Sequence, residues 1–493
     1  MIKDDLRCLK SIPSNVTTVY VTTKYDLEAD QEYLYRLILE SQSVTVLNGC
    51  NTLKYGLPKS IKSIIFNNFN EPLFKGSLPN TLEIINFEDR FFKQEILPGV
   101  LPVGLHKLYL NNYQHLIQAG VLPVGLRVLS LFKYQHEILP GILPVGLKRL
   151  SLSFYGFEIK PGVLPDGLRE FSFGSSFGFQ YDIQPGVLPS SLEYLSIDSF
   201  NPPVEPVETN LEDLQYSGKS FLPISWLQAI SSLSNLQSLS IYIFHEVGHD
   251  NTIFNVNYLP PTLKTFYFTL RGTALRGTMP TSLKSIYLDC QYNINEIYPE
   301  TKKYHLEFME CENNIIKLIP SNIKIDELII RGESREPKIT LPTGFGKIKL
   351  SFILTDLKDS TIEFGREDTI DHSLCSLREL HLPTFKDGPP KIVKLPNTIE
   401  YLNIGNNDLN DILHLIPSSL NTLVFDKQSE INISISNTIK SITNLIVKFE
   451  MFNIRTIRKL DDNYYVMYGE CSRRLIARIF HHSKLDQILN NLQ

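Results

Sequence analysis

The sequence has few cysteines, and their spacing predicts no chemical role. The 493 residues include six cysteines, and no two of them form a C-x-x-C pair. Zinc sites and disulfide frameworks normally need closely spaced cysteines, so we expect neither, and we expect no bound cofactor. Scattered free thiols are typical of a reducing compartment, which favours a cytoplasmic protein.

Long apolar runs and an excess of basic residues are also missing. No run of about 18 apolar residues occurs, and the opening MIKDDLRCLKSIP lacks the apolar core of a signal peptide. Lysine and arginine total 48 against 53 acidic residues, which gives a formal net charge of −5. Proteins that bind nucleic acids or anionic membranes usually carry basic excess, so we expect neither partner.

The main feature of the sequence is a short repeat. The segments LPVGLHKLYL, LPVGLRVLSL, LPVGLKRLSL, LPDGLREFSF and LPSSLEYLSI follow one another, and their leading leucines are Leu101, Leu122, Leu143, Leu164 and Leu188. The first four leucines are 21 residues apart, and the last spacing is 24. A fixed period near 20 residues indicates a solenoid, in which each repeat forms one coil.

Each copy has the composition of a turn followed by a short strand. Proline sets a turn, and the small residue before the first core leucine suits a tight bend. Leu129 and Leu131 then alternate at period two, which predicts a strand that points both side chains into the core. A Pro-Gly pair, as in 96–100 and 138–142, marks another turn in the return half of the coil. We therefore expect extended or turn structure there rather than a helix.

The pattern divides the chain into three parts. Residues 1–56 are expected to form an N-terminal cap with a degenerate repeat and one helix, since the apolar spacing over 28–41 is helical. The repeat array is expected over 57–450, with interruptions around 198–235 and 289–318. Terminal units must shield the apolar edge of an array, which is why caps are expected at both ends.

The last part, residues 451–493, is expected to form a C-terminal cap of a hairpin and a helix. IRKLDDNYYVMYG, over 457–469, has turn residues between two β-prone runs and predicts a hairpin. Apolar residues over 473–489 recur at helical spacing and predict an amphipathic helix. Its expected apolar side consists of Leu475, Ile476, Ile479, Leu485 and Ile488.

The unit LPxSLxxLxF, followed by Tyr or Phe and then I-x-P-G-x-LP, resembles the FNIP repeat, a leucine-rich-repeat-like unit found in social amoebae and giant viruses. The resemblance covers most of 57–493 and is strongest over 57–197. It implies a β-rich leucine-rich-repeat-like solenoid with one short parallel strand per coil of about 21–23 residues and small helical caps. Many family members carry an F-box ahead of the repeats and would recruit ubiquitin-ligase substrates, but the first 56 residues contain no recognisable F-box.

Ordinary leucine-rich repeats place an asparagine after the strand, where it forms a ladder with the backbone. This sequence has Tyr113, Tyr134 and Tyr155 at the equivalent position, and only Asn407 keeps the asparagine. We expect the stacked aromatic rings to take over the ladder's role by packing.

Two short motifs match the signatures of enzymes. His245-Glu246-Val247-Gly248-His249 fits the HExxH pattern, in which two histidines bind zinc and the glutamate activates water. That motif belongs within a long helix, whereas here it follows a repeat strand, so a loop is the better interpretation. Gly174 to Gly178 fits GxSxG, but no helix follows it as a nucleophile elbow requires.

Charged residues define the candidate partner-binding surface. In successive copies the residue after the first core position is charged or histidine, and Lys107 and Arg149 lie one place further on. If the coils stack in register, these side chains line one face, and an acidic partner would relieve their mutual repulsion. Solvated, unpartnered charges are the alternative. The predicted surface residues are Lys107, Arg127, Lys148, Arg149 and Arg169.

The sequence as a whole predicts a non-enzymatic scaffold for protein–protein interactions. A row of exposed strands offers many shallow contacts, which suits another protein better than a small substrate. Three alternatives remain open: a substrate-recruiting adaptor of a ubiquitin ligase, a zinc peptidase that uses His245, Glu246 and His249, and a structural or lineage-expanded protein with no dedicated partner. The sequence does not identify the partner or the oligomeric state.

Overall fold

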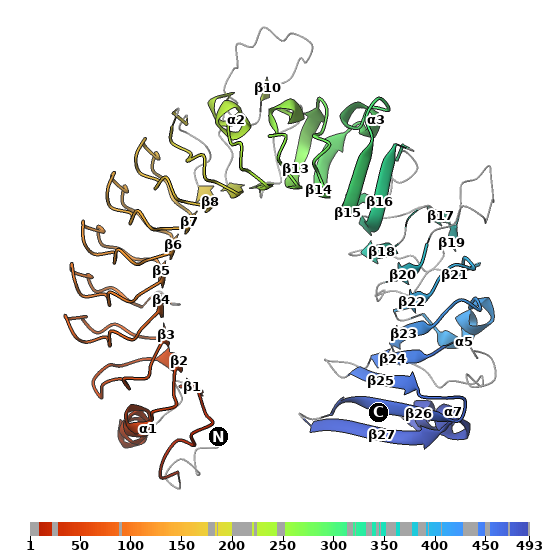
Figure 1. The fold of residues 1–493 in the computed structure, drawn as a ribbon, viewed down its shortest axis with the longest axis horizontal. Coiled ribbons are helices and arrows are strands. Elements are labelled where there is room, and N and C mark those ends of the chain that lie inside the picture. Colours follow the sequence, from red (N-terminus) through yellow and green to blue (C-terminus); the bar gives the residue numbers. More distant parts are fainter. Residues whose placement is uncertain are drawn as a thin grey trace. The chain divides into compact units, whose positions relative to one another are not determined.

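A computed structural model gives the fold of the chain (Figure 1). The residues that it describes are 9–21, 28–87, 91–175, 183–184, 186–199, 219–220, 224–243, 252–312, 319–320, 322–331, 338–341, 345, 347–351, 361–364, 377–382, 391–392, 394–405, 407–426, 442–448, 454–471 and 474–491. The chain divides into two compact units, Met1–Ser282 and Leu283–Gln493. Each unit is described by itself.

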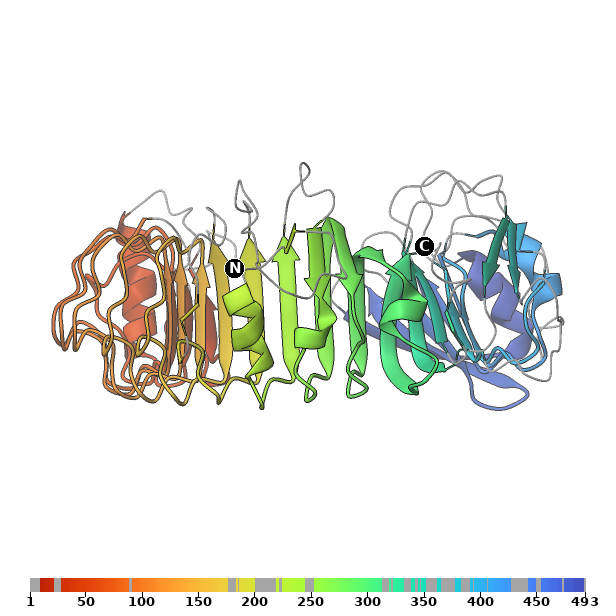
Figure 2. The same cartoon turned by 90° about the horizontal axis from the view of Figure 1, so that it is seen from above.

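Unit 1 is a parallel β-solenoid in which each coil contributes a short strand. Strand β1 pairs with β2, each strand up to β9 pairs with the next, and β9, β11 and β13 continue the sheet, all in parallel. Figure 2 shows these strands side by side. The predicted solenoid is thereby confirmed. The strands are β1 (Thr18–Tyr20), β2 (Val46–Cys50), β3 (Ser63–Phe66), β4 (Ile84–Phe87), β5 (Lys107–Asn111), β6 (Val128–Phe132), β7 (Arg149–Ser153), β8 (Glu170–Ser175), β9 (Tyr194–Ser199), β10 (Lys219–Ser220), β11 (Ser238–Ile243), β12 (Thr252–Asn255) and β13 (Thr265–Arg276).

The core of unit 1 consists of leucine columns that run across the coils. In β6, Leu129 and Leu131 are fully buried while Val128, Ser130 and Phe132 face outward. The register aligns Leu129 with Leu108 of β5 and Leu150 of β7, so like side chains stack in adjacent coils. Each buried leucine contributes about 1.5–3 kcal/mol, and the repeat multiplies this contribution along the array.

A β-turn precedes each strand and brings neighbouring coils into close contact. The Leu126 N–H donates to the Pro123 carbonyl at 3.0 Å, and the same bond recurs in the next coil between Leu147 and Pro144. Gly104 fits this turn because a Cβ there would lie 2.9 Å from the backbone carbonyl oxygen of Asn80 in the preceding coil. The small residue that the sequence places before the core leucine therefore sets the coil spacing.

Tyrosine side chains link one coil to the next on the return side. The Tyr113 hydroxyl accepts the Ile96 N–H at 2.8 Å, and the hydroxyls of Tyr134 and Tyr155 accept the corresponding N–H groups of Ile117 and Ile138, each at 2.9 Å. All three rings are buried. The expected packing role is present, and in addition each hydroxyl satisfies a buried N–H that would otherwise lack a partner.

A left-handed residue turns the chain toward each of these tyrosines. The φ values of Asn112, Lys133 and Phe154 are 60°, 57° and 60°, and each of these residues immediately precedes one of the three tyrosines. A side chain in this conformation costs roughly 1–2 kcal/mol. The strain recurs at the same point of three coils, so it belongs to the geometry that directs the tyrosines inward.

Two helices lie on the return side of unit 1, away from the strands (Figure 1). Helix α1 (Glu28–Glu40) covers the segment with predicted helical spacing, and α2 (Ile224–Ser231) carries Trp226, which is buried. Between α1 and α2, the described coils over 51–175 contain no helix. A short side pairing joins β10 and β12, and η2 (Val256–Tyr258) follows β12.

Unit 2 has the same architecture with less regular coils. Strands β14, β15, β16, β18, β20, β22, β23 and β24 pair in parallel in that order, and β17, β19 and β21 form a separate parallel sheet. The strands are β14 (Ser285–Tyr292), β15 (Tyr304–Glu312), β16 (Ile323–Arg331), β17 (Lys338–Leu341), β18 (Lys347–Ser351), β19 (Thr361–Phe364), β20 (Glu379–His381), β21 (Lys391–Ile392), β22 (Tyr401–Asn403), β23 (Thr422–Asp426) and β24 (Asn444–Lys448). Short helices α3 (Ile294–Ile297), α5 (Leu409–Ile412) and η4 (Leu413–Leu415) lie in the return segments.

The end of unit 2 is antiparallel. Strands β24, β25 (Ile454–Lys459), β26 (Tyr464–Cys471) and β27 (Arg474–His481) pair in sequence, and Asp461 caps the β25–β26 turn by accepting the N–H groups of Asn463 and Tyr464, each at 2.8 Å. This is the hairpin that the sequence predicts.

The prediction of a helix over 473–489 is wrong for the first half of this segment. Residues Arg474–His481 form β27, and only η5 (His482–Lys484) and α7 (Leu485–Asn491) are helical. Pairing along the whole of β26 overrides the local spacing, and Ile479, assigned to the apolar side, is 64% exposed. No described helix is long and apolar enough to span a membrane.

Candidate partner-binding surface

The predicted charged column exists as a continuous backbone ladder in unit 1. The N–H of Arg127 donates to the carbonyl of His106 at 2.8 Å, that of Lys148 to Arg127 at 2.8 Å, and that of Arg169 to Lys148 at 2.9 Å. The same backbone bond joins His106 to Glu83 before this set, and Glu193 to Arg169 after it. The coil register therefore places Arg127, Lys148 and Arg169 next to one another, directly before β6, β7 and β8.

Lys107 and Arg149 belong to an adjacent row on the open face of the sheet. They are the first residues of β5 and β7, both are exposed, and Val128 of β6 lies between them in the register. The next position in the row is Glu170 of β8. All five predicted surface residues are thus brought to one edge of the sheet, over four successive coils.

The cations at this edge differ in how they are neutralised. Arg149 makes a two-point ion pair with Glu170, with Nη2 donating to Oε1 at 2.7 Å, and this hydrogen bond raises the pKa of the guanidinium. Arg169 lies 3.3 Å from the Glu193 carboxylate. Arg127 and Lys148 instead donate to the carbonyl oxygens of Gly146 and Gly167 in the following coils, at 2.9 and 3.1 Å. No carboxylate of the described residues pairs with those two side chains.

The local excess of positive charge is large for this chain. Residues 101–153 contain five lysines and arginines and one acidic residue, so this segment has a formal charge of +4 in a protein of −5. Like charges on adjacent strands repel and destabilise the sheet. The arrangement therefore favours an anionic group from outside the coil stack.

Three residues beside this surface were not predicted from the sequence. Val103, Val124 and Val145 are 77%, 86% and 88% exposed at the turn of three adjacent coils. The signal was present in the sequence, because these three copies read LPVGL while neighbouring copies have a polar residue in place of valine.

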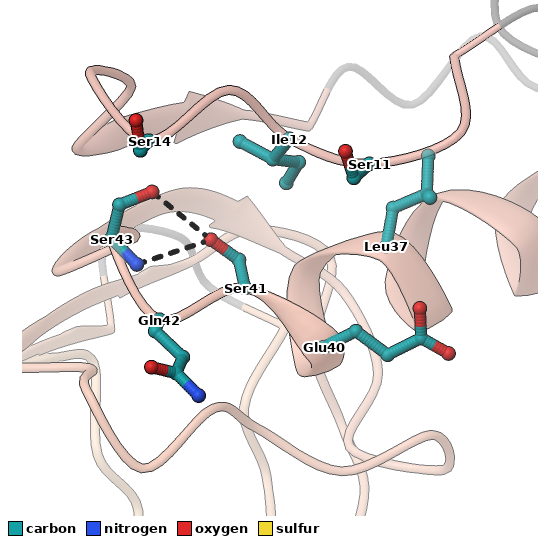
Figure 3. Close-up of a pocket in the computed structure, with 8 residues that line it drawn as sticks. All are labelled: Ser11, Ile12, Ser14, Leu37, Glu40, Ser41, Gln42 and Ser43. Atoms are coloured by element: carbon teal, nitrogen blue, oxygen red, sulfur yellow. Dashed lines mark hydrogen bonds between the residues drawn. The ribbon is translucent and has the colours of Figure 1, made fainter.

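A cavity of about 340 Å³ in the N-terminal part offers no comparable chemistry (Figure 3). Its serine groups are already used: Ser41 Oγ accepts the N–H groups of Ser43 and Val44, and Ser43 Oγ donates to the carbonyl of Val16 at 2.9 Å. The bond to Val16 joins the segment before α1 to the residues that follow α1. The lining residues are Ser11, Ile12, Ser14, Leu37, Glu40, Ser41, Gln42 and Ser43.

The enzyme-like motifs receive no support from the described residues. His245, Glu246 and His249 lie outside them, as does most of the GxSxG segment. Among the described residues no three His, Cys, Asp or Glu side chains gather as a metal site would require. Cys50 is a free thiol whose pKa burial raises to about 12, so it stays protonated at neutral pH.

The repeat geometry defines a β-solenoid repeat protein, and comparison with known families specifies the repeat. The family model for the FNIP Repeat matches residues 51–89, 92–133, 134–176 and 158–200. The matched segments of the chain therefore consist of FNIP repeats, as the sequence predicts. The matched segments contain Tyr113, Tyr134 and Tyr155 and all five candidate surface residues.

No curated protein matches the chain. Among solved structures, the chain is similar to CroV588, described as a novel circular LRR protein, at 20% identity and a TM-score of 0.43. The match covers 83% of this chain and 67% of the other.

Proposed function

We propose that this protein, which contains FNIP repeats, is a non-enzymatic interaction scaffold, and that the edge formed by Lys107, Arg127, Lys148, Arg149 and Arg169 binds an acidic surface of a partner protein. The observation that carries the proposal is the stack of Arg127 and Lys148 in adjacent coils. Both are exposed, and neither is paired with a carboxylate in the described part of the chain.

The surroundings support this assignment in two ways. Glu83 and Glu193 bound the column at its two ends, so the positive region has a defined length of four coils. The outward residues of β6 and β7 beside it, Ser130 and Ser151, are small and half-buried. Small side chains beside a charged edge offer many shallow contacts, which suit a protein partner better than a small molecule that needs a concave site.

The test is partner capture from the native cell with the triple variant R127E/K148E/R169E. A matched control, K302E/K349E/K394E, makes the same change of charge at exposed sites in unit 2. We expect the first variant to lose a partner that the wild type and the control retain, and we expect that partner to dissociate as salt rises. Capture that is unchanged in the triple variant would refute the proposal.

A further inference from the structure

The valines beside the cationic edge narrow the chemistry of the partner. Val103, Val124 and Val145 occupy the second position of a β-turn in which the leucine two residues on donates its N–H to the proline carbonyl, at 3.1, 3.0 and 3.0 Å. This corner projects away from the coil. Other copies place Lys59, Asn80, Asp166 and Ser190 at the corner, all of them exposed.

The three valine corners stack directly on one another. A Cβ on Gly125 would lie 3.2 Å from the Val103 carbonyl oxygen, and one on Gly146 would lie 3.4 Å from that of Val124. Consecutive corners are thus in backbone contact. Their side chains form a ridge of exposed methyl groups across three coils, and we name Val103, Val124 and Val145 the valine ridge.

Cationic groups reach the base of this ridge. Arg127 Nη1 donates to the carbonyl of Gly146, the residue after Val145, and Lys148 Nζ donates to Gly167 in the next coil. An apolar strip and a positive strip therefore run side by side over the same coils. Contiguous exposed apolar residues are characteristic of interaction sites, whereas single ones are common on any surface.

We infer that the valine ridge binds the apolar side chains of an acidic protein segment, a conclusion that rests on the proposed function of the cationic edge. The segment's carboxylates lie against Arg127 and Lys148, and its apolar residues cover the valines. Strands of adjacent coils are about 4.8 Å apart, and one α-helical turn rises 5.4 Å. An acidic amphipathic helix therefore presents about one apolar residue to each valine.

Nucleic acid fits this surface less well. Its phosphates would use the cations, but a phosphate backbone offers nothing to a row of methyl groups. The valine ridge should therefore favour an acidic peptide over other polyanions. The experiment must measure the binding of peptides and of a nucleic acid.

The experiment selects binders from a displayed library of random peptides of about 15 residues, with the full-length protein as bait. Binding is then measured on three proteins: the wild type, V103T/V124T/V145T and R127E/K148E/R169E. Threonine keeps the shape of valine and changes only its polarity. The control variant N80T/S190T alters the same corner in flanking coils.

We expect the enriched peptides to be acidic, with apolar residues at a spacing of three or four. Their affinity should fall about tenfold or more in the threonine variant and should be unchanged in the control, because each valine loses a buried methyl group. It should also fall in the charge-reversal variant.

Other outcomes overturn the inference. If charge reversal abolishes binding while the threonine variant binds as the wild type does, the cationic edge stands and the valine ridge has no role. If neither variant weakens binding, or no acidic peptide is enriched, both ideas fail. A single-stranded oligonucleotide that binds the wild type and the threonine variant equally, and more tightly than any selected peptide, would identify a nucleic-acid surface.

Discussion

The two units use the same backbone ladder but place different charges on it. In unit 2, opposite charges follow one another on this ladder: the N–H of Glu400 donates to the carbonyl of Arg378 and their side chains lie 3.5 Å apart, and Glu307 is placed in the same way 3.9 Å from Lys284. In unit 1, Arg127 and Lys148 are adjacent and have the same sign. The fold therefore does not require cations at this position.

The difference shows where stability has been given up. Opposite charges on neighbouring strands contribute roughly 0.2–1 kcal/mol per pair, and like charges cost a similar amount. Unit 2 gains from such pairs, whereas Arg127 and Lys148 of unit 1 do not. A local loss that the fold does not need is typical of a binding site.

The first prediction concerns how the coils are tied together. Tyr134 links two coils of unit 1, whereas Asn407 of unit 2 bonds within its own turn, to Ile404. Tyr134→Ala should lower the free energy of unfolding of unit 1 by about 3–5 kcal/mol, because it opens a cavity and leaves the Ile117 N–H unpaired. Urea unfolding followed by the fluorescence of Trp226, the one tryptophan of the chain, measures unit 1.

The milder variant separates packing from hydrogen bonding. Tyr134→Phe keeps the ring and removes only the hydroxyl, so a loss of about 1–3 kcal/mol is expected. If Tyr134→Phe is as stable as the wild type, the hydroxyl ladder does not hold the coils together.

The second prediction concerns alkaline pH. Burial raises the pKa of Tyr113 from its usual value near 10 to about 12. Below pH 10 the tyrosine is protonated in both folded and unfolded chains, and its stabilising contribution is complete. As pH rises from 10 to 12 only the unfolded chain ionises, so stability should fall by about 2–3 kcal/mol. Tyr113→Phe should unfold with a shallower pH dependence, measured by the same fluorescence, and an identical slope would contradict this account.

The third prediction concerns the close approach of the coils. Gly104→Ala places a Cβ 2.9 Å from a backbone oxygen that cannot easily move, and we expect it to destabilise unit 1 by about 1–3 kcal/mol. Gly125→Ala, with 3.2 Å to its nearest neighbour, should cost less. Equal stability of both variants and the wild type would mean that coil spacing tolerates a methyl group.

Much of this architecture could be predicted from the sequence because each coil repeats the same pattern of turn and core residues. The 21-residue period, the alternation of Leu129 and Leu131, and the turn proline determine strand, core and register together. The column of Arg127, Lys148 and Arg169 followed directly from that register. The pairing of Arg149 with Glu170 depends on side-chain geometry, so the sequence did not show which cations lack a carboxylate.

Prediction failed where long-range pairing decides the structure. The spacing of Leu475, Ile476 and Ile479 is helical, yet β26 provides a complete edge for pairing and residues 474–481 become a strand. The role of the tyrosine hydroxyls was also beyond the sequence, because their partners lie 17 residues earlier in a different coil.

Lys148→Glu is the most direct test of the claim that the cationic edge exists for binding. The change places a carboxylate between Arg127 and Arg169, as unit 2 places Glu400 next to Arg378. We predict that unit 1 becomes more stable, by about 0.2–1 kcal/mol in urea unfolding followed by Trp226 fluorescence, while binding to the selected acidic peptides is lost. A variant that is less stable than the wild type and binds those peptides unchanged would show that Lys148 supports the fold, through its bond to Gly167, and does not bind a partner.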